Sequence, residues 1–322
     1  MRDYTTACIF GGTGFIGTQV VRELAARGVR IKVATRTPAS AYFLRPCGSV
    51  GQIVPYKCDY SEADSIRQAV SGCDYVINCT GILFEKKKNA FERVHVDIPS
   101  AIAKACADEG VERFVHISAL GIEASTSKYA NSKFQGEKAV KNAFPAVSIL
   151  RPSVVFGEDD DFFNKFASMA PLVPFLPLIG GGHTKFQPVY VGDVADAVVT
   201  CLTLPTMGQD NPQGKTFELG GSDVVTFKGI YETMFEYTEN PRPLVNLPWG
   251  LAKVQASVLS LLPTPILTCD QVESLKTDNI VGKDALTLAS LGVKATAMRS
   301  ILPTYLSRFQ PGGRFAKIKK AS

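Results

Sequence analysis

A glycine-rich run near the N-terminus has the spacing of a phosphate-binding turn. It follows an apolar segment, opens a helical one, and reads Gly11, Gly12, Thr13, Gly14, Phe15, Ile16 and Gly17. Gly11 or Gly12 permits the tight turn, Gly14 lets the backbone approach a pyrophosphate, and Gly17 lets helix and strand pack closely. Because free amides and the dipole at a helix start favour anions, we predict that these seven residues bind the diphosphate of a dinucleotide.

The residue that ends the second apolar segment distinguishes the two nicotinamide cofactors. An acid there would bond the ribose 2′-hydroxyl of NAD(H), whereas an arginine suits the 2′-phosphate of NADP(H). This segment ends in Arg36 without an acid, and a guanidinium can bind phosphate through two parallel hydrogen bonds. NADP(H) is therefore favoured over NAD(H); the alternative is that Arg36 is a solvated surface charge. Asp59 is predicted to bond the adenine amino group, and Thr80 and Gly81 to lie where the cofactor ribose passes.

A tyrosine and a lysine four positions apart are the candidate acid–base pair. Tyr129 and Lys133 begin a predicted helix after the fifth apolar segment, and this spacing puts both side chains on one helix face. A neighbouring ammonium would favour the phenolate. Tyr129 is accordingly expected to act as general acid or base if the protein is an enzyme, while Lys133 also bonds the nicotinamide ribose.

Alternating strands and helices must position these residues. Several predicted strands are continuous apolar runs, which is typical of parallel strands covered on both faces. Their alternation with helices predicts an α/β fold with a doubly wound, Rossmann-type parallel sheet. The predicted strands are Thr6–Phe10, Ile31–Thr35, Gln52–Tyr56, Tyr75–Cys79, Arg113–Ser118 and Val147–Leu150, and the predicted helices lie at about 15–27, 62–71, 90–109 and 130–143, with a poorly patterned link near 38–46.

Beyond residue 157 the pattern changes, because prolines and glycines interrupt it. We expect a dinucleotide-binding domain at 1–157 whose sheet is completed by about 184–204. Residues 158–183 and 205–310 are expected to form a smaller C-terminal α/β lobe for a substrate or partner, and 311–322 a basic tail. A predicted helix at 249–262 carries an apolar stripe of Leu251, Val254, Val258, Leu261 and Leu262. Packing inside this lobe is favoured over docking on a partner or a membrane surface.

Composition excludes several classes of protein. The 322 residues are 45% hydrophobic and 20% charged, with a net charge of +5, which is globular and too weakly basic for a nucleic-acid protein. The eight cysteines have no ligand-like spacing, so we predict reduced core thiols and no metal site. No segment has the length of a membrane-spanning helix, and no leader is evident. We therefore expect a bacterial cytoplasmic protein, peripheral on the inner membrane at most, or one on the matrix side of a mitochondrion.

The glycine turn, the Tyr129/Lys133 pair and Arg151-Pro152 resemble the short-chain dehydrogenase/reductase superfamily, in its extended or atypical branch. In active members of that superfamily a Ser or Thr closing the fifth strand lies beside the tyrosine. Here Ser118 comes too early and Leu120 stands where the hydroxyl is expected. Ser125, Thr126 and Ser127 are the candidate substitutes. Since losing such a donor costs about 10²–10³ in rate, the resemblance implies an intact dinucleotide site beside an incomplete reductase site.

Six further segments narrow the resemblance. Together they look like the dehydrogenase-like accessory subunit family of respiratory complex I and its bacterial relatives, over about residues 5–310. This implies bound NADP(H) with a structural or sensing role, held by the glycine turn, Arg36, Tyr129 and Lys133, on the peripheral arm near the membrane. The segments are Asn78–Glu85, Leu150–Gly157, Pro177–Gly182, Thr184–Val194, Phe217–Gly221 and Leu267–Asn279.

Three functions remain open at this point. The favoured one is a non-catalytic, NADP(H)-binding accessory or assembly subunit of complex I. The alternatives are an NADPH-dependent reductase or epimerase acting on a carbonyl substrate, with Tyr129 as proton donor, and a regulator that senses the NADP(H) ratio.

Overall fold

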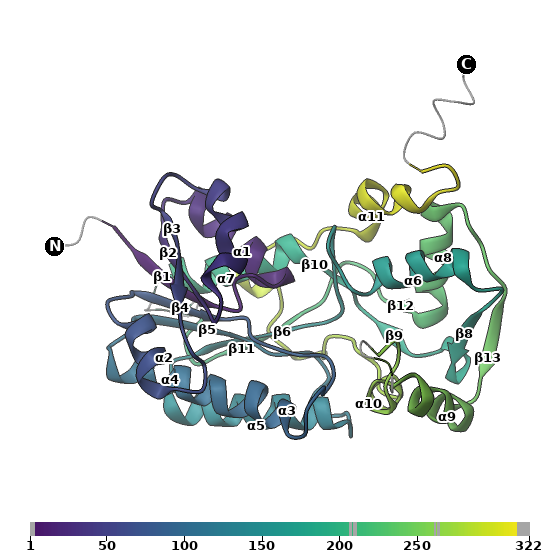
Figure 1. Ribbon diagram of the computed structural model, residues 1–322, viewed down its shortest axis with the longest axis horizontal. Helices are drawn as coiled ribbons and strands as arrows, with labels where there is room; N and C mark the ends of the chain where they lie inside the picture. The colour runs from purple at the N-terminus through teal and green to yellow at the C-terminus, as the bar shows by residue number, and fades with distance from the viewer. Residues whose placement is uncertain (1–3, 206–207, 209–210, 261, 263–264, 314–322) are drawn as a thin grey trace, which may run out of the picture.

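A seven-stranded parallel sheet forms the centre of the dinucleotide-binding half (Figure 1). The computed structural model describes residues 4–205, 208, 211–260, 262 and 265–313. The strand order is β11-β6-β5-β4-β1-β2-β3, which confirms the doubly wound Rossmann-type sheet. The strands are β1 (Thr6–Phe10), β2 (Arg30–Thr35), β3 (Ile53–Lys57), β4 (Tyr75–Asn78), β5 (Arg113–Ile117), β6 (Ser148–Pro152) and β11 (Thr216–Leu219).

Helices cover both faces of this sheet, as the continuous apolar strands require. Every residue of β1 and β5 is buried. One face packs against α1 (Phe15–Ala26), the 3₁₀ helix η1 (Pro38–Cys47) and α7 (Val191–Thr203). The other packs against α2 (Ala63–Val70), α4 (Ile98–Asp108) and α5 (Lys128–Ala143). The two sets lie above and below the sheet in Figure 1.

The strand that completes the sheet differs from the prediction. Residues 184–204 supply α7, which covers a sheet face, but their strand β10 (Val189–Tyr190) pairs with β7 (Val155–Phe156) in a separate two-stranded sheet. The edge strand is β11, which the sequence assigned to the C-terminal lobe; it continues the parallel register beside β6. The error arose because β11 has only four residues and is surrounded by turn-forming residues, so its periodicity is weak.

The long helix predicted at 90–109 is broken into three pieces: α3 (Ala90–Glu92), the π-helix η2 (Arg93–Asp97) and α4. Pro99 explains the widening, because it lacks the N–H that would bond to the carbonyl of His95 four residues earlier. Helix α5 approaches at the same point, where a Cβ on Gly136 would lie 1.8 Å from the His95 oxygen. The wide turn therefore brings His95 against the helix that carries Tyr129 and Lys133.

A second hydrophobic core lies beside the sheet, to the right in Figure 1. It is rich in aromatic residues in mutual contact, among them Phe166, Phe227 and Tyr231. The helices and strands of this region are α6 (Phe163–Met169), η3 (Ala170–Leu172), β8 (Leu176–Ile179), η4 (Gly180–Gly182), β9 (Lys185–Phe186), β12 (Val225–Thr226), α8 (Phe227–Thr238), β13 (Leu244–Leu247), α9 (Trp249–Leu259), α10 (Cys269–Ser274), α11 (Met298–Leu306) and η6 (Ser307–Phe309). The short 3₁₀ helix η5 (Ala289–Leu291) instead packs against α7 in the core of the parallel sheet.

The apolar stripe of α9 faces outward, so the favoured prediction that it packs inside the lobe is wrong. Leu251, Val254 and Val258 are 59%, 64% and 64% exposed, and Leu262 is also exposed. Ala252 and Ala256 are the buried residues of this helix. Small side chains let α9 lie close to its neighbours, which leaves the larger apolar groups in solvent. Leu261 and most of the predicted basic tail, residues 314–322, lie outside the described residues.

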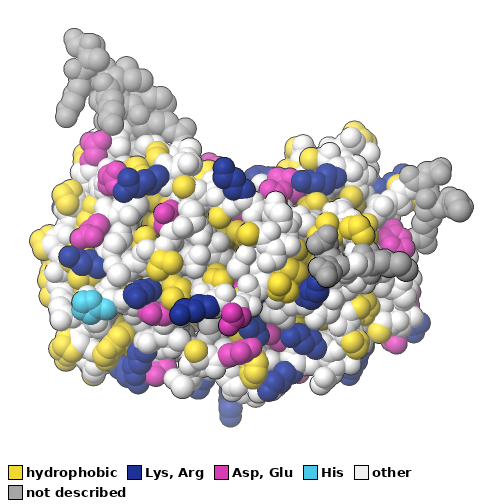
Figure 2. Space-filling model, turned by 180° about the vertical axis from the view of Figure 1, so that it is seen from behind, with side chains coloured by type: hydrophobic (Ala, Val, Ile, Leu, Met, Phe, Trp, Pro, Cys, Tyr) yellow, Lys and Arg dark blue, Asp and Glu magenta, His cyan; other side chains and the backbone are white. Residues whose placement is uncertain are grey.

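The surface charges and the cysteines can be compared with what the composition predicts. On the face in Figure 2, Lys and Arg side chains alternate with Asp and Glu rather than forming one basic stripe. The cysteines are all unpaired thiols, and five of them are buried. Within the described ranges, no cluster of His, Cys, Asp and Glu suits a metal ion. Nor does any helix in those ranges combine the length and hydrophobicity needed to cross a membrane.

Candidate dinucleotide site

The glycine turn connects β1 to α1 as predicted, and its backbone geometry requires glycine at two positions. Gly11 has φ +74°, a left-handed conformation that other residues adopt at a cost. A Cβ at Gly11 would also lie 2.8 Å from the Cys79 carbonyl, at the end of β4. A Cβ at Gly17 would lie 2.2 Å from the Gly11 oxygen. The turn is thus packed on itself and on β4 without room for side chains.

Gly14 occupies a different environment, because it faces solvent at the N-cap of α1. Its N–H bonds to the Gly11 oxygen at 3.0 Å, and no side chain caps the helix start. A twelve-residue helix with an uncapped N-terminus and an exposed glycine suits an anionic group. Thr13, Phe15 and Ile16 are partly buried around it. The backbone at this turn therefore fits a dinucleotide diphosphate.

The two residues predicted at the adenosine end lie close to each other. Arg36 is exposed directly after β2. Asp59 is also exposed, and its Oδ1 accepts hydrogen bonds from the Ser61 N–H and hydroxyl at 2.9 and 2.6 Å. These bonds, with smaller contributions from Arg93 and Arg36, hold the pKa of Asp59 below its usual value. The carboxylate thus shapes its own turn, and its second oxygen has no hydrogen bond among the described residues.

The segment after β4 brings Thr80 and Gly81 to the same edge of the sheet. Asn78, which the sequence analysis did not single out, holds this segment: its Oδ1 accepts the N–H and the hydroxyl of Thr80 at 3.0 and 2.7 Å. Gly81 lies against Lys133, whose Nζ is 3.5 Å from the place a Cβ would occupy. The Lys133 ammonium therefore lies directly beside the segment that follows β4.

The Tyr129/Lys133 pair is assembled on α5, but its electrostatics differ from the prediction. Burial raises the pKa of Tyr129 to about 12, and Lys133 is not among the causes. Lys133 instead donates to the Ile117 carbonyl at 3.2 Å. Its own pKa is lowered to about 8 by burial, against the opposing effects of Glu137 and Cys79. The expectation of a phenolate favoured by the lysine is therefore wrong in this structure.

His95 is a further residue of this site that sequence reasoning missed. The Ile82 N–H donates to its Nε2 at 3.2 Å, so Nδ1 carries the proton and donates to the Ser132 hydroxyl at 2.8 Å. Ser132 donates in turn to the Tyr129 carbonyl at 2.8 Å. Burial, with help from Lys133, lowers the pKa of His95 to about 3, so the ring is neutral. This chain of bonds joins the segment after β4 to α5, and the sequence signal was a histidine four residues before Pro99.

The candidate substitutes for the active-site hydroxyl are engaged elsewhere. Ser127 accepts from the Ala130 N–H at 3.1 Å and so caps α5. Ser125 donates to Ser127 at 3.2 Å. Thr126 donates to Glu273 at 3.2 Å. Leu120, at the expected hydroxyl position, is buried.

Two buried polar atoms near Lys133 lack hydrogen-bond partners among the described residues. They are the Ser118 hydroxyl and His116 Nε2, at the end of β5. Asn78 Nδ2 donates to His116 Nδ1 at 3.1 Å, so Nε2 carries the proton. Burial first, then Lys133 and His95, keeps the pKa of His116 well below its usual value. Buried donors without partners are costly, and their position at the carboxyl end of the sheet fits a polar group bound there.

Arg151, one of the residues that carried the resemblance, forms a buried ion cluster instead of facing the turn. It donates to both oxygens of Glu137 at 2.9 and 2.7 Å and to Glu123 at 2.6 Å. Glu137 is 2% exposed and lies one turn after Lys133 on α5. The cluster joins β6 to this helix and fixes the position of Lys133 along the sheet edge.

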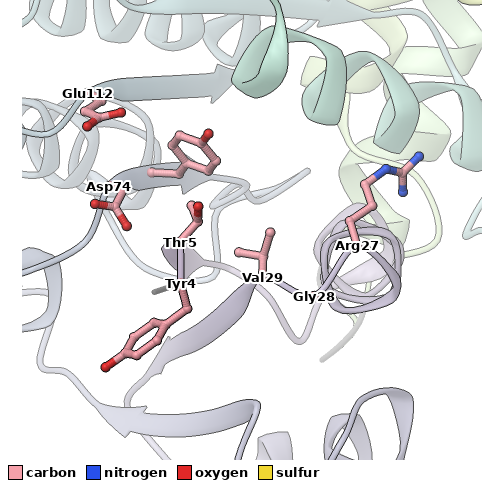
Figure 3. Close-up of a pocket in the computed structure, with 8 residues that line it drawn as sticks. Tyr4, Thr5, Arg27, Gly28, Val29, Asp74 and Glu112 are labelled. Atoms are coloured by element: carbon pink, nitrogen blue, oxygen red, sulfur yellow. The ribbon is translucent and has the colours of Figure 1, made fainter. Parts of the chain in front are cut away.

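A surface hollow lies away from this site. It has a volume of about 760 Å³ and is lined by Tyr4, Thr5, Arg27, Gly28, Val29, Asp74, Tyr75 and Glu112. Figure 3 shows Asp74 and Glu112 on one side and Arg27 on the other. These residues precede or begin the strands, so the hollow is at the amino-terminal edge of the sheet. Ligands of such sheets bind at the carboxyl edge, and none of the predicted site residues lines this hollow.

Comparison with known proteins gives matches over most of the chain. Residues 7–220 match the NAD dependent epimerase/dehydratase family. NADH dehydrogenase (ubiquinone) 1 alpha subcomplex subunit 9, mitochondrial, of Arabidopsis thaliana is 34% identical over 95% of this chain and 78% of its own length. Ceramide reductase of Caulobacter vibrioides is 30% identical over 62% of each chain.

Among solved structures, the NADPH-dependent quinone oxidoreductase of Escherichia coli in complex with NADPH is similar. Its TM-score is 0.70 at 18% identity, over 94% of this chain and 98% of that one. At this identity the likeness concerns the fold. It agrees with the Rossmann-type sheet described above.

Proposed function

The chain belongs to the NAD dependent epimerase/dehydratase family, among the relatives of subunit 9 of the complex I alpha subcomplex, and from this premise we propose that it is a non-catalytic, NADP(H)-binding accessory or assembly subunit of complex I. The relative from Arabidopsis thaliana is named as a subunit of NADH dehydrogenase (ubiquinone) and aligns with 95% of the chain, which supports the association with complex I. The proposal places the protein at the inner membrane, on the cytoplasmic side of a bacterium or the matrix side of a mitochondrion.

The cofactor preference follows from the two ends of the site. In this proposal the glycine turn binds the diphosphate, Arg36 binds the 2′-phosphate, and Lys133 binds the nicotinamide ribose. The other proposed contacts are made by Gly12, Asp59, Thr80, Gly81 and Tyr129. When bound, NADP(H) would supply hydride chemistry, which a reductase would use. The exposed Arg36 stands directly after β2, where an NAD(H) site would have an acid, and this supports the phosphorylated cofactor.

One observation carries the non-catalytic part of the proposal: the buried Leu120 stands where a hydroxyl beside the tyrosine is expected. A phenol with a pKa of about 12 is a weak acid at neutral pH, whereas efficient proton transfer needs a pKa near the working pH. The hydroxyls of Ser125, Thr126 and Ser127 are bonded elsewhere. The site therefore favours holding a dinucleotide over processing a carbonyl.

The exposed stripe of α9 is the proposed docking face for the complex I peripheral arm or the adjoining membrane surface. Contiguous exposed apolar residues on a soluble domain mark interaction sites. In the proposed domain division, this face belongs to the C-terminal lobe at 158–183 and 205–310, apart from strand β11.

Affinity purification tests the proposal. The tagged full chain, isolated from membranes in mild detergent, is expected to recover complex I subunits together with NADP(H), identified by native mass spectrometry. Val254→Glu with Val258→Glu should abolish recovery of the subunits and leave the dinucleotide in place. Val224→Glu, at an exposed valine outside α9, is the matched control. Recovery of no complex I subunit by the unaltered chain would contradict the assembly proposal.

The reductase alternative has one specific observation in its favour, the ceramide reductase relative. It predicts NADPH oxidation with a long-chain carbonyl substrate and loss of that activity in Tyr129→Phe. The non-catalytic proposal predicts that the unaltered chain and Tyr129→Phe both bind NADPH and that neither of them oxidises it. The sensing alternative predicts clearly different affinities for NADPH and NADP⁺, which isothermal titration of both forms would measure.

A further inference from the structure

A segment of the C-terminal half crosses the carboxyl edge of the sheet and contacts the start of α5 at Lys128 and Tyr129. We call residues 268–282 the strap. It begins with α10, which Thr268 and Gln271 cap reciprocally, and then runs past the ends of β5, β6 and β11. In Figure 1, α10 lies near the start of α5 and beside α9. The strap bonds to all these elements, although it is more than 100 residues away from most of them in sequence.

At its first contact the strap caps the helix that carries the candidate acid–base pair. The Asp270 carboxylate accepts the Lys128 N–H at 2.7 Å and the Tyr129 N–H at 3.0 Å. These amides are in the first turn of α5 and have no partner within the helix. A carboxylate at this position also interacts favourably with the helix dipole. The position of Tyr129 therefore depends on a residue 141 positions later.

At its second contact the strap joins the loops that follow β5 and β6. Asn279 Nδ2 donates to the Leu120 carbonyl at 2.8 Å, and its Oδ1 accepts the Ser153 hydroxyl at 2.6 Å. The backbone N–H of Asn279 donates to the Lys185 carbonyl at 2.8 Å. One amide side chain thus bridges two loops while its backbone is fixed by β9. Further along, the Gly282 N–H donates to Glu218 in β11 at 2.8 Å.

These contacts place the strap where an open α/β sheet receives its ligands, outside the carboxyl ends of the strands. We propose that the strap closes the substrate side of the dinucleotide site, with Asp270 and Asn279 as its positioning residues. The strap retains the dinucleotide and denies hydride acceptors access to the nicotinamide. This inference rests on the dinucleotide binding proposed above, and it gives the proposed absence of turnover a physical cause that is separate from the acidity of Tyr129.

The test measures exchange and accessibility of bound NADPH in the full chain. Stopped-flow fluorescence follows dissociation of NADPH when excess NADP⁺ is added. A second assay follows oxidation of the bound NADPH by phenazine methosulfate, a small soluble acceptor that takes the hydride and leaves NADP⁺. In Asp270→Ala/Asn279→Ala, both rates should rise about tenfold or more, as expected when hydrogen bonds worth about 1.4 kcal/mol are lost. Lys283→Ala, at an exposed position just beyond the strap, should match the unaltered chain.

Milder variants keep the test decisive if the double variant does not fold. Asp270→Asn keeps the size of the side chain but removes the charge at the α5 N-terminus, and Asn279→Ser shortens the bridge. Each should raise both rates by a smaller factor. Unchanged rates in these variants, with NADPH still bound, would contradict the proposal that the strap closes the site, but they would not contradict the proposed function. If neither the unaltered chain nor Lys283→Ala binds NADPH, both the strap proposal and the proposed NADP(H)-binding function would be contradicted.

Discussion

The two ends of the candidate dinucleotide site are built in different ways. The phosphate end consists of consecutive residues from Gly11 to Gly17, and it works through backbone amides and missing side chains. The Tyr–Lys end is assembled from separated segments, with Asn78, His95, Lys133 and Asp270 each contributing a side chain. The first end is a property of one turn, whereas the second is a property of the whole fold.

This difference determines how each end responds to change. The backbone turn should fail when a Cβ is added at Gly11 or Gly17, where backbone atoms leave no space, but distant substitutions should leave it intact. A side-chain network distributes its stabilising free energy over many hydrogen bonds. The loss of one bond should therefore reduce stability moderately and also affect the other residues of the network. Four substitutions test this contrast, in order of decreasing expected effect.

The largest effect is expected for Gly17→Val at the phosphate end. The new Cβ would meet the Gly11 oxygen at 2.2 Å and the Gly12 Cα at 2.7 Å, both backbone atoms that cannot move without opening the turn. We expect a loss of about 3 kcal/mol or more in the free energy of unfolding and no measurable NADPH binding. Urea denaturation and isothermal titration measure the two effects.

Gly14→Ala is the control for that substitution. Its Cβ would meet only the Gly11 oxygen, at 3.3 Å, so the protein should remain folded while the methyl group obstructs approach of the diphosphate. If Gly17→Val were as stable as Gly14→Ala, the close packing at Gly17 would not contribute to stability. The proposed difference between the two ends of the site would then be wrong.

The second effect concerns the ion cluster behind the Tyr–Lys end. In Glu137→Gln, Arg151 loses its most buried partner and keeps Glu123, which is 60% exposed, and Glu218 at 3.7 Å. Removing one partner of a buried pair costs about 3 kcal/mol, and the two remaining acids reduce that to about 2 kcal/mol. Because Glu137 also raises the pKa of Lys133, that pKa should fall further.

Urea denaturation of Glu137→Gln gives the stability change. Glu123→Gln, which removes the exposed partner, should cost less than about 1 kcal/mol. Equal losses in the two variants would show that burial does not decide the strength of this cluster.

The same contrast separates what the sequence could predict from what it could not. The glycine turn, the approximate positions of the first six strands and the α5 pair follow from local patterns, because a turn or an amphipathic period is encoded in neighbouring residues. The contacts of Asp270 and Asn279 depend on how residues more than a hundred positions apart meet, and no local pattern encodes that. The same reason explains the misassigned edge strand β11 and the outward stripe of α9.

The pKa of Tyr129 is the most instructive failure. The four-residue spacing put Tyr129 and Lys133 on one face as expected, but spacing does not specify where an ammonium points. Lys133 is bonded to the Ile117 carbonyl, and Tyr129 packs edge-on against Phe91 and His95, with ring centroids 5.9 and 5.4 Å away. Apolar packing therefore determines the acidity that the pattern assigned to a neighbouring charge.

The third effect tests cofactor selection at the phosphate end. Arg36→Ser removes the guanidinium proposed to bind the 2′-phosphate, and a hydrogen bond to a charged group contributes about 1.5–3 kcal/mol. NADPH affinity should fall by about tenfold to a hundredfold, while NADH affinity should not change. Isothermal titration with both cofactors measures the selectivity. If the affinity for NADH fell by the same factor, Arg36 would support the turn and would not select the 2′-phosphate.

The smallest effect is expected at Lys133, and its sign depends on pH. Burial lowers the pKa of Lys133 from about 10.5 to about 8, so at neutral pH the folded protein carries a buried charge that costs stability. Between about pH 8 and 10.5 the folded state has released this proton while the unfolded state still holds it, so the stability of the unaltered apoprotein should rise with pH. Lys133→Met has no such group and should not show this rise.

Thermal melts of the two apoproteins between about pH 7 and pH 10 measure this difference. At pH 7 the methionine variant should be more stable by about 1 kcal/mol, since replacing a buried charge by an apolar group is often stabilising, and the advantage should disappear as the pH rises. NADPH binding should weaken in the same variant. A residue whose removal stabilises the empty protein but weakens its complex is maintained for the ligand. A constant destabilisation at every pH would instead assign Lys133 a structural role, as a donor to the Ile117 carbonyl.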